Sequence, residues 1–388
     1  MLRDFNRIIN RKNTNSIKWD ALKEIFGQDD LIPLWVADMD FPAPEEVTQA
    51  LIERAKHPIY GYSNLGEEYY NAIINWTKQR HNWSIEKDWI MYTPGVVPAI
   101  NWIIQSFTAP GDKIIIQEPV YHPFKNSIAL NDRITVNNEL KFENGVYRMD
   151  FENLEASIDK DVKLFILCNP HNPVGRVWEK WELERLGEIC LKHNILVVSD
   201  EIHSDLIYEG YTHIPFASIS QKFADNSIVC TAPTKTFNLA GLQCSNIIIP
   251  NKKVRDAFKS TLEKQHIQEA TPFGIAGVQA AYQHGEQWLN EVMKYINNNL
   301  EFMIDYLNKN LPEVKVIKPQ GTYLIWVDFR GLKISREELN NILLNKAKVA
   351  LNDGYMFGES GYNFQRINIA CPKPLLEEAL KRICEAFK

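Results

Sequence analysis

The sequence has no long apolar run, no signal-like start and no excess of positive charge. Nowhere in its 388 residues do about 18 apolar residues follow one another, so we expect no membrane-spanning helix. The first residues, MLRDFNRIINRKN, are charged and lack the apolar core of a secretory signal. The formal net charge of -6 gives no basic footprint for nucleic acid or for an acidic membrane surface. We therefore expect neither a nucleic acid nor a membrane as a partner.

Cysteine and histidine are too scattered to form a metal-ligand motif. The six cysteines show no CxxC spacing, and several lie in apolar segments with the pattern of strands or helices. The nine histidines do not cluster with them at ligand spacings, so we expect no metal site. The thiols are predicted to be reduced core residues of a cytoplasmic protein. Their positions are Cys168, Cys190, Cys230, Cys244, Cys371 and Cys384.

What the sequence does contain is an alternation of short apolar runs with helical segments. Runs near residues 114, 164, 196 and 228 predict an α/β fold with a mainly parallel sheet flanked by helices. A chain of this length exceeds one ordinary core, and residues 314–329 alternate as a hairpin-like pair. We predict an N-terminal arm with part of a small domain over 1–48, a large domain over 49–285 and a smaller C-terminal α+β domain over 286–388.

Several of the predicted strands lead to a side chain suited to chemistry. Asn172 lies in NPHNPVG after one strand, Asp200 ends the next, and Lys235 follows the strand SIVC. Tyr121 comes directly after DKIIIQEPV. Because open α/β sheets bind ligands outside the carboxyl ends of their strands, these side chains should meet in one crevice. A lysine held there, partly desolvated, can form a Schiff base, although most isolated loop lysines are simply solvated.

A glycine turn before a helix supplies a candidate anion site. The turn Thr93-Pro94-Gly95 opens the helical segment VVPAINWIIQSF, so several free backbone N–H groups meet the positive end of a helix dipole. That arrangement favours a phosphate. A lysine, a carboxylate, an amide, an aromatic ring and a phosphate site together suit pyridoxal 5'-phosphate (PLP), which needs a lysine for its aldehyde and an acid on its ring nitrogen.

Arg366 interrupts an apolar strand in the segment GYNFQRINIACP. An inward arginine would be a buried charge that seeks a carboxylate, and its bidentate geometry suits the α-carboxylate of an amino acid. The alternative is an edge-strand arginine paired with a surface acid, and the residues alone leave both open. Asp38 and Asp40, on either side of a methionine, are interpreted as turn or cap residues in preference to a catalytic pair.

Four motifs, in family order and spacing, resemble those of fold-type I PLP enzymes of the class I/II aminotransferase superfamily: NPHNPVG, SDEIH, PTKTFNLAG and FQRINIA. The resemblance covers nearly the whole chain, and the motifs are specific together although each is weak alone. Four further segments, WVADMDFPAP, YGYS, TPGVVPAI and DEIHSDL, resemble the MalY/PatB-type cystathionine β-lyases. Ordinary aminotransferases of the superfamily usually have tyrosine in place of His203, and many have arginine in place of Gln243 and serine in place of Ala232.

The resemblance implies a role for each residue around the cofactor. Lys235 would hold PLP and later move the Cα proton of the substrate. Asp200 would keep the pyridine nitrogen protonated, and His203 would support this electron sink. Asn172 would donate a hydrogen bond to the ring oxygen, and Tyr121 would stack on the ring.

The resemblance also implies how phosphate and substrate are bound. Thr234 and the N–H groups around Val96 and Val97 would bind the phosphate. Arg366, helped by Asn172 and the backbone near Ala37, would bind the substrate carboxylate. Members of the superfamily are homodimers with shared active sites, so Tyr62, with Tyr60 as second choice, would reach the phosphate from the partner chain.

The predicted function is a PLP-dependent carbon–sulfur β-lyase of sulfur amino-acid metabolism. It would cleave cystathionine or cysteine S-conjugates to a thiol, pyruvate and ammonia. The first alternative is a PLP-dependent aminotransferase. His203 and Gln243 argue against it, because they differ from the tyrosine and arginine that aminotransferases of the superfamily usually have there. A second alternative is a regulatory binding protein on the same fold, against which the intact Lys235, Asp200 and Arg366 argue. The sequence leaves the preferred thioether and any protein partner open.

Overall fold

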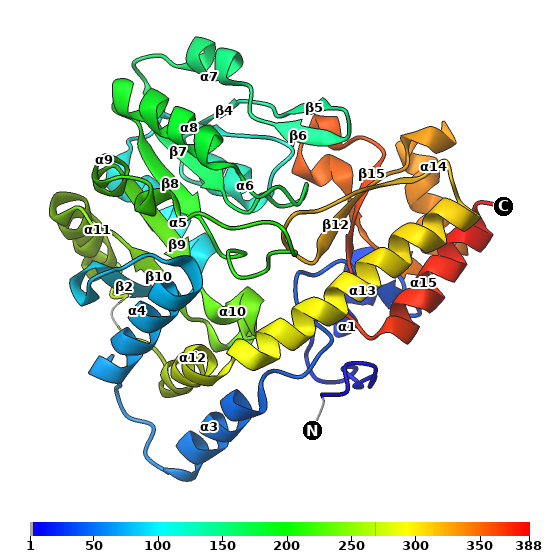
Figure 1. Cartoon of the computed structure of the whole chain (residues 1–388), viewed down its shortest axis with the longest axis horizontal. Coiled ribbons are helices and arrows are strands. Elements are labelled where there is room, and N and C mark those ends of the chain that lie inside the picture. Colours follow the sequence, from blue (N-terminus) through cyan, green and yellow to red (C-terminus); the bar gives the residue numbers. More distant parts are fainter. Residues whose placement is uncertain (1–2, 268) are drawn as a thin grey trace.

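A computed structural model describes residues 3–267 and 269–388 and has a seven-stranded sheet at its centre (Figure 1). The strands are β2 (Ile90–Thr93), β3 (Lys113–Ile116), β4 (Ile134–Asn137), β7 (Val162–Cys168), β8 (Leu196–Asp200), β9 (Ser227–Thr231) and β10 (Ser245–Ile248). Their order is β2-β10-β9-β8-β7-β3-β4. The strands from β9 to β4 are parallel, and β10 is antiparallel to β9 and β2. The predicted α/β fold with a mainly parallel sheet is confirmed.

Helices cover both faces of this sheet because its strands are apolar on both sides. In β3, Ile114 and Ile116 pack against one set of helices, whereas Ile115 between them packs against the other. The first set is α5 (Val96–Phe107), α6 (Pro123–Leu130) and α11 (Lys252–Lys264), and the second is α7 (Phe151–Ser157), α8 (Lys180–Lys192) and α9 (Gln221–Asp225). Because both faces of the sheet are buried, the sequences of these strands are continuous apolar runs.

A further group of helices packs against β9 and β10. These are α3 (Glu45–Lys56), α4 (Glu67–His81) and α12 (Pro272–His284). In Figure 1 they lie together at the end of the sheet where the Lys235 turn, α10 (Pro233–Thr236), is found. This group therefore forms the support behind that turn.

The C-terminal part contains a four-stranded antiparallel sheet in the order β11-β12-β15-β14. Its strands are β11 (Lys315–Ile317), β12 (Leu324–Asp328), β14 (Asn352–Asp353) and β15 (Phe364–Asn368). The long helix α13 (Glu286–Asn310) and α15 (Lys373–Ala386) cover it, and α14 (Arg336–Asn341) lies at its edge (Figure 1). The predicted hairpin over 314–329 is confirmed as β11 and β12. The domain boundaries after residues 48 and 285 stay a prediction.

The N-terminal arm contains the short helices α1 (Ile17–Asp20) and α2 (Leu22–Phe26), followed by β1 (Ile32–Pro33), which pairs with β13 (Val349–Ala350). Buried charges fix it in place. The fully buried Lys18 Nζ lies 2.6 Å from Asp40 Oδ2 and 3.3 Å from Asp38 Oδ1. Arg11 also pairs with Asp38 and Asp40, at 2.6 and 2.7 Å. The two acids are thus ion-pair partners of the arm, and their interpretation as turn or cap residues was wrong.

Two short strands, β5 (Lys141–Glu143) and β6 (Val146–Arg148), form a separate hairpin. Within the part of the chain that the structure describes, no helix is long and apolar enough to cross a membrane, and no three potential ligand side chains gather as a metal site. All six cysteines are free and buried, in agreement with the predicted core thiols.

Candidate active site

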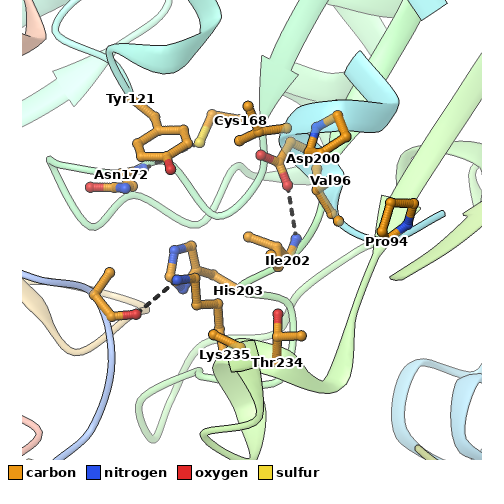
Figure 2. Close-up of a pocket in the computed structure, with 15 residues that line it drawn as sticks. Pro94, Val96, Tyr121, Cys168, Asn172, Asp200, Ile202, His203, Thr234 and Lys235 are labelled. Carbon is orange, nitrogen blue, oxygen red and sulfur yellow. Dashed lines mark hydrogen bonds between the residues drawn. The ribbon is translucent and has the colours of Figure 1, made fainter. Parts of the chain in front are cut away.

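The carboxyl ends of the central strands open into one cavity of about 210 Å³ (Figure 2). Tyr121, Asn172, Asp200 and Lys235, which follow or end β3, β7, β8 and β9, all line it. The sequence-based expectation that these side chains meet in one crevice therefore agrees with the geometry. Of the other candidates, Ala37, Val96, Val97, His203 and Thr234 also line the cavity.

Lys235 is held across the cavity by the loop that precedes α3. Its Nζ donates a hydrogen bond to the carbonyl oxygen of Ala37 at 2.8 Å, which is drawn in Figure 2. Burial lowers the pKa of Lys235 to about 8, against the opposing effect of Asp38. An amine with a pKa close to neutrality is partly unprotonated at physiological pH, so it can act as a nucleophile and as a base.

Asp200 is a buried carboxylate, and it forms no salt bridge with any residue that the structure describes. Its Oδ1 accepts a hydrogen bond from the Ile202 N–H at 3.1 Å (Figure 2). Burial raises the pKa of Asp200 to about 7. Because a buried carboxylate is costly without a partner, this position suits a group that carries a proton or a positive charge, such as a protonated pyridine nitrogen.

His203 lines the cavity as a neutral imidazole. Burial lowers its pKa to about 3, and the positive charges of Lys235 and Arg366 act in the same direction. The hydrogen bond to Asp200 comes from the Ile202 N–H and not from His203. The Nδ1 of His203 is buried with no hydrogen-bond partner among residues 3–267 and 269–388. It is therefore available to a ligand.

Arg366 lies in β15, between β12 and β14, and only 4% of it is exposed. Its Nη1 donates to Asn172 Oδ1 at 3.1 Å, and its Nη2 donates to Asn352 Oδ1 at 2.6 Å and to the Trp35 carbonyl at 3.0 Å. No acid among the described residues pairs with it, and its Nε is buried without a partner. Burial lowers its pKa to about 10, so it stays positive at neutral pH. The inward alternative is therefore correct, and the edge-strand alternative is wrong.

The start of α5 and the residue before Lys235 form the other end of the cavity. Gly95 is the N-cap of α5, and the residues Pro94 to Pro98 line the cavity with the N-terminal end of that helix. Figure 2 shows Pro94, Val96 and Thr234 on one side of the cavity and Asn172 on the other. Free N–H groups at a helix start beside a hydroxyl group suit a phosphate. Gln243 does not line the cavity, and its carbonyl accepts from the Tyr92 hydroxyl at 3.1 Å.

Tyr121 and Cys168 bound the cavity from the side of β3 and β7. Burial raises the pKa of the Tyr121 phenol, so it stays neutral and can donate a hydrogen bond. Cys168 Sγ accepts from the Asn172 N–H and donates to the Pro170 carbonyl, both at 3.4 Å. Cys168 thus helps to fix the loop that carries Asn172.

Tyr62 and Tyr60 are not brought to the cavity. Tyr62 is 96% exposed, and the Tyr60 hydroxyl donates to the Ala55 carbonyl at 2.7 Å. Both lie on the loop between α3 and α4. Their contribution from a partner chain stays a prediction.

The chemistry of the cavity lining fits PLP. Asp200, a buried carboxylate that pairs with no cation among the described residues, could hold the ring nitrogen, and Lys235 could bond to the aldehyde carbon. Tyr121 offers an aromatic face, and Asn172 offers an amide whose oxygen is already bound by Arg366. The start of α5, with Thr234, could bind the phosphate. Every group that PLP requires from a protein is therefore present on the walls of one cavity.

Three residues near the site were not predicted from the sequence. Cys168 ends β7 and could have been noticed, since it directly precedes NPHNPVG. Trp35 and Asn352 bind Arg366. Trp35 opens the motif WVADMDFPAP, but nothing in that motif points to Arg366, 331 positions away, and no local pattern marks Asn352 on the neighbouring strand β14.

Comparison with known proteins agrees with the fold and identifies the family. The family model for aminotransferase class I and II matches residues 29–383. Cystathionine β-lyase PatB of Bacillus subtilis is 45% identical over 99% of this chain and 100% of its own length.

Two solved structures give the same result. Cystalysin from Treponema denticola, which contains a PLP cofactor, is 40% identical, with a TM-score of 0.97 over 100% of this chain and 99% of its own. A PLP-bound protein from Clostridium difficile 630, provisionally described as an aminotransferase, is 49% identical, with a TM-score of 0.98 over 99% of this chain and 100% of its own. The chain therefore belongs to the aminotransferase class I and II family of fold-type I PLP-dependent enzymes and, within it, to the branch of PatB.

Proposed function

We propose that this protein is a PLP-dependent carbon–sulfur β-lyase that cleaves cystathionine or cysteine S-conjugates. The observation that carries the proposal is the buried Arg366, which has no acidic partner among the described residues, binds Asn172 on the cavity wall and acts electrostatically on Lys235. This arrangement suits an amino acid bound by its carboxylate, with its Cα close to a lysine amine. The names of PatB and cystalysin, and the position of His203 within DEIHSDL, support elimination.

The overall reaction converts cystathionine and water to homocysteine, pyruvate and ammonia. When bound, PLP supplies an electron sink for the negative charge that develops at the substrate Cα. Arg366 binds the substrate carboxylate and so fixes the Cα near Lys235. Lys235, with its lowered pKa, removes the Cα proton as a base. The Cβ–S bond then breaks, its electron pair leaves with the sulfur as a thiolate, and the proton that Lys235 took from Cα converts the thiolate to a thiol.

The other side chains prepare the site. Asp200 would hold a proton at the ring nitrogen of bound PLP, which its raised pKa and buried position favour. Asn172, oriented by Arg366 and Cys168, would donate a hydrogen bond to the ring oxygen of PLP. Neutral His203 would offer an uncharged donor or acceptor to the cofactor, and Tyr121 would offer its aromatic face.

The protein is further proposed to be a cytoplasmic homodimer with shared active sites. Tyr62 is almost fully exposed and lies close in sequence to the exposed Ile59 and Tyr60, which together make an apolar surface that a second copy would cover. In that dimer Tyr62 would complete the phosphate site of the neighbour. Six free, buried cysteines support a reducing compartment.

The test is pyruvate release from cystathionine by the PLP-loaded protein. We expect homocysteine and pyruvate in equal amounts without any added 2-oxo acid. Lys235→Ala should lower kcat by about 10³-fold, because both the base and the cofactor attachment are lost. Lys259→Ala, which changes an exposed lysine on α11, is the matched control and should keep full activity.

The aminotransferase alternative gives a different result when 2-oxoglutarate is added to the assay. A transaminase would form no thiol and would need a 2-oxo acid as amino acceptor for sustained turnover. If 2-oxoglutarate is consumed and no homocysteine appears, the lyase proposal is wrong. The provisional description of the Clostridium difficile protein makes this control necessary.

A further inference from the structure

The segment that carries Asp200 and His203 faces two separate cavities. Asp200 and His203 line the active-site cavity (Figure 2). Glu201 and Asp205 line a second, small cavity of about 20 Å³, just large enough for one water molecule. This segment thus presents Asp200 and His203 to the active-site cavity and the acids Glu201 and Asp205 to the second cavity.

Asp205 is a buried carboxylate with three hydrogen-bond donors. Its Oδ1 accepts from Trp76 Nε1 at 3.1 Å and lies 2.9 Å from His81 Nε2, and its Oδ2 accepts from Thr236 Oγ1 at 2.8 Å. Burial acts to raise the pKa of Asp205, but the hydrogen bond and charge of His81, together with Thr236, outweigh it and lower the pKa. Asp205 is therefore an ionised acceptor that joins two elements.

One of these elements is a long helix and the other is a single helical turn. Trp76 and His81 lie on α4, a 15-residue helix packed in the core. Thr236 lies on α10, which has only four residues and cannot fix its own position by helical hydrogen bonds. Thr236 is fully buried and directly follows Lys235. The bond from Thr236 to Asp205 thus ties the lysine-bearing turn to α4.

A second acid–histidine pair supports the same segment. Glu201 Oε2 lies 2.9 Å from His213 Nε2, and Glu201 Oε1 accepts from Ser199 Oγ at 2.8 Å and from the Phe216 N–H at 2.9 Å. The His213 and His81 rings meet edge to face at 5.4 Å. The end of β8, which carries Asp200, is therefore held through Glu201 and His213, and His213 contacts the same His81 that binds Asp205.

We propose that Asp205 is a positioning residue that fixes the Lys235 amine by holding Thr236 against α4. The inference rests on the proposed role of Lys235. The charged groups that act on the Lys235 amine are Asp38, Arg366 and Asp200, and Asp205 is not one of them. Asp205 therefore acts through geometry, and a displacement of about 1 Å at the reacting group is enough to cost about 10²-fold in rate.

The experiment compares three threonine variants as PLP-loaded proteins. Thr236→Val removes the hydroxyl donor with little change of shape, and Thr236→Ser keeps it. Thr77→Val is the matched control, because Thr77 lines the same small cavity but its hydroxyl donates only to the Ile73 carbonyl of its own helix, at 2.8 Å. The measurements are kcat and KM for cystathionine, the pH midpoint of the visible absorbance of the bound cofactor, and the melting temperature.

We expect Thr236→Val to lower kcat by about 10- to 100-fold with KM changed less than about threefold, and to shift the absorbance midpoint by about half a pH unit or more. Thr236→Ser should recover most of kcat and the original midpoint, and Thr77→Val should leave both unchanged. Asp205→Asn, as a second variant, should change both in the direction of Thr236→Val.

Two results would overturn the proposal. In one, Thr236→Val has the kcat and absorbance midpoint of the unchanged protein. In the other, Thr77→Val loses as much activity as Thr236→Val at an equal fall in melting temperature, which would make the role merely structural. Failure of the proposed function is recognised separately, because the unchanged protein would then release no homocysteine from cystathionine.

Discussion

At the scale of single residues, the site is built from charges that the chain itself leaves unsatisfied. Asp200 has no cation and Arg366 has no acid among the residues that the structure describes. Both are buried. Burial raises the pKa of Asp200 and lowers the pKa of Arg366, which favours the neutral form of each side chain. Such groups are costly unless a ligand completes them, so they mark where the cofactor and the substrate belong.

Arg366→Lys is expected to weaken substrate binding. Lysine keeps the charge but lacks the planar fork that holds Asn172 and Asn352 and leaves room for a carboxylate. The loss of a charged hydrogen bond, about 1.5–3 kcal/mol, should raise KM for cystathionine by roughly 10- to 100-fold. Arg330→Lys, at an arginine 49% exposed and paired with Asp328, is the control and should leave KM unchanged. An unchanged KM in Arg366→Lys would exclude Arg366 as the carboxylate site.

Asp200→Asn is expected to stabilise the cofactor-free protein at high pH. The folded-state pKa of Asp200 is about 7, above its ordinary value of 3.8, so the folded protein binds more protons than the unfolded chain between these values. The stability of the cofactor-free protein should therefore fall as pH rises from about 4 to 7, by at most about 4 kcal/mol from this group.

The measurement is the melting temperature of cofactor-free Asp200→Asn and of the unchanged protein at pH 5.5 and pH 8. The advantage of the variant should be larger at pH 8, because asparagine removes the buried negative charge. The same variant should lose β-lyase activity when PLP is added, since the ring nitrogen loses its acid. A stability difference that does not grow with pH would contradict the assignment of a raised pKa to Asp200.

At the scale of elements, the N-terminal arm is the part that closes the site. Lys18 and Arg11 hold Asp38 and Asp40, and the adjoining Ala37 carbonyl accepts from Lys235. The Tyr323 hydroxyl donates to the same carbonyl at 3.1 Å. The loop that meets the lysine is therefore positioned by ion pairs outside the cavity.

Lys18→Met is expected to destabilise the protein and to loosen this loop. Removing the cation leaves Asp40 buried with Arg11 as its remaining cation, so the lost charged hydrogen bond should cost about 1.5–3 kcal/mol in the free energy of unfolding by urea. Lys56→Met removes an exposed pair with Glu53 and should cost less than about 0.5 kcal/mol. An equal fall in the free energy of unfolding in the two variants would show that the buried Lys18–Asp40 pair stabilises the protein no more than the exposed Lys56–Glu53 pair does.

At the scale of the whole molecule, the surface around Tyr62 predicts a dimer that completes two sites. If Tyr62 acts on the partner's cofactor, Tyr62→Ala and Lys235→Ala chains should complement each other. A mixed dimer would have one site with both changes and one intact site. Random reassembly of the two inactive proteins should then restore roughly a quarter of the full activity.

The control for this experiment is each variant reassembled with itself, which should stay inactive. If Tyr62 acts within its own chain, every mixed dimer carries one change in each site and no activity returns. Sedimentation of the unchanged protein should give about twice the chain mass of 44.9 kDa. A monomer at micromolar concentration would overturn the shared site.

The sequence by itself determined four parallel strands of the seven-stranded sheet and the four side chains at their carboxyl ends. Buried parallel strands must be apolar on both faces, so β3, β7, β8 and β9 could be predicted from continuous apolar runs in the sequence. Lys235 and Asp200 were then identified because they lie at the carboxyl ends of two of these runs. Motif order then gave the family. Local patterns could supply this much because each depends on residues that are neighbours in the chain.

Only the tertiary structure decided the contacts between distant residues. Whether Arg366 points inward depends on β15 being a central strand, and its partners Trp35 and Asn352 come from other elements. The pairing of Lys18 with Asp40 and of Asp205 with Thr236 likewise joins residues more than 20 positions apart. The sequence gives the chemical type of a buried polar side chain. Its partner depends on how distant segments pack together, and no periodic pattern in the sequence encodes that packing.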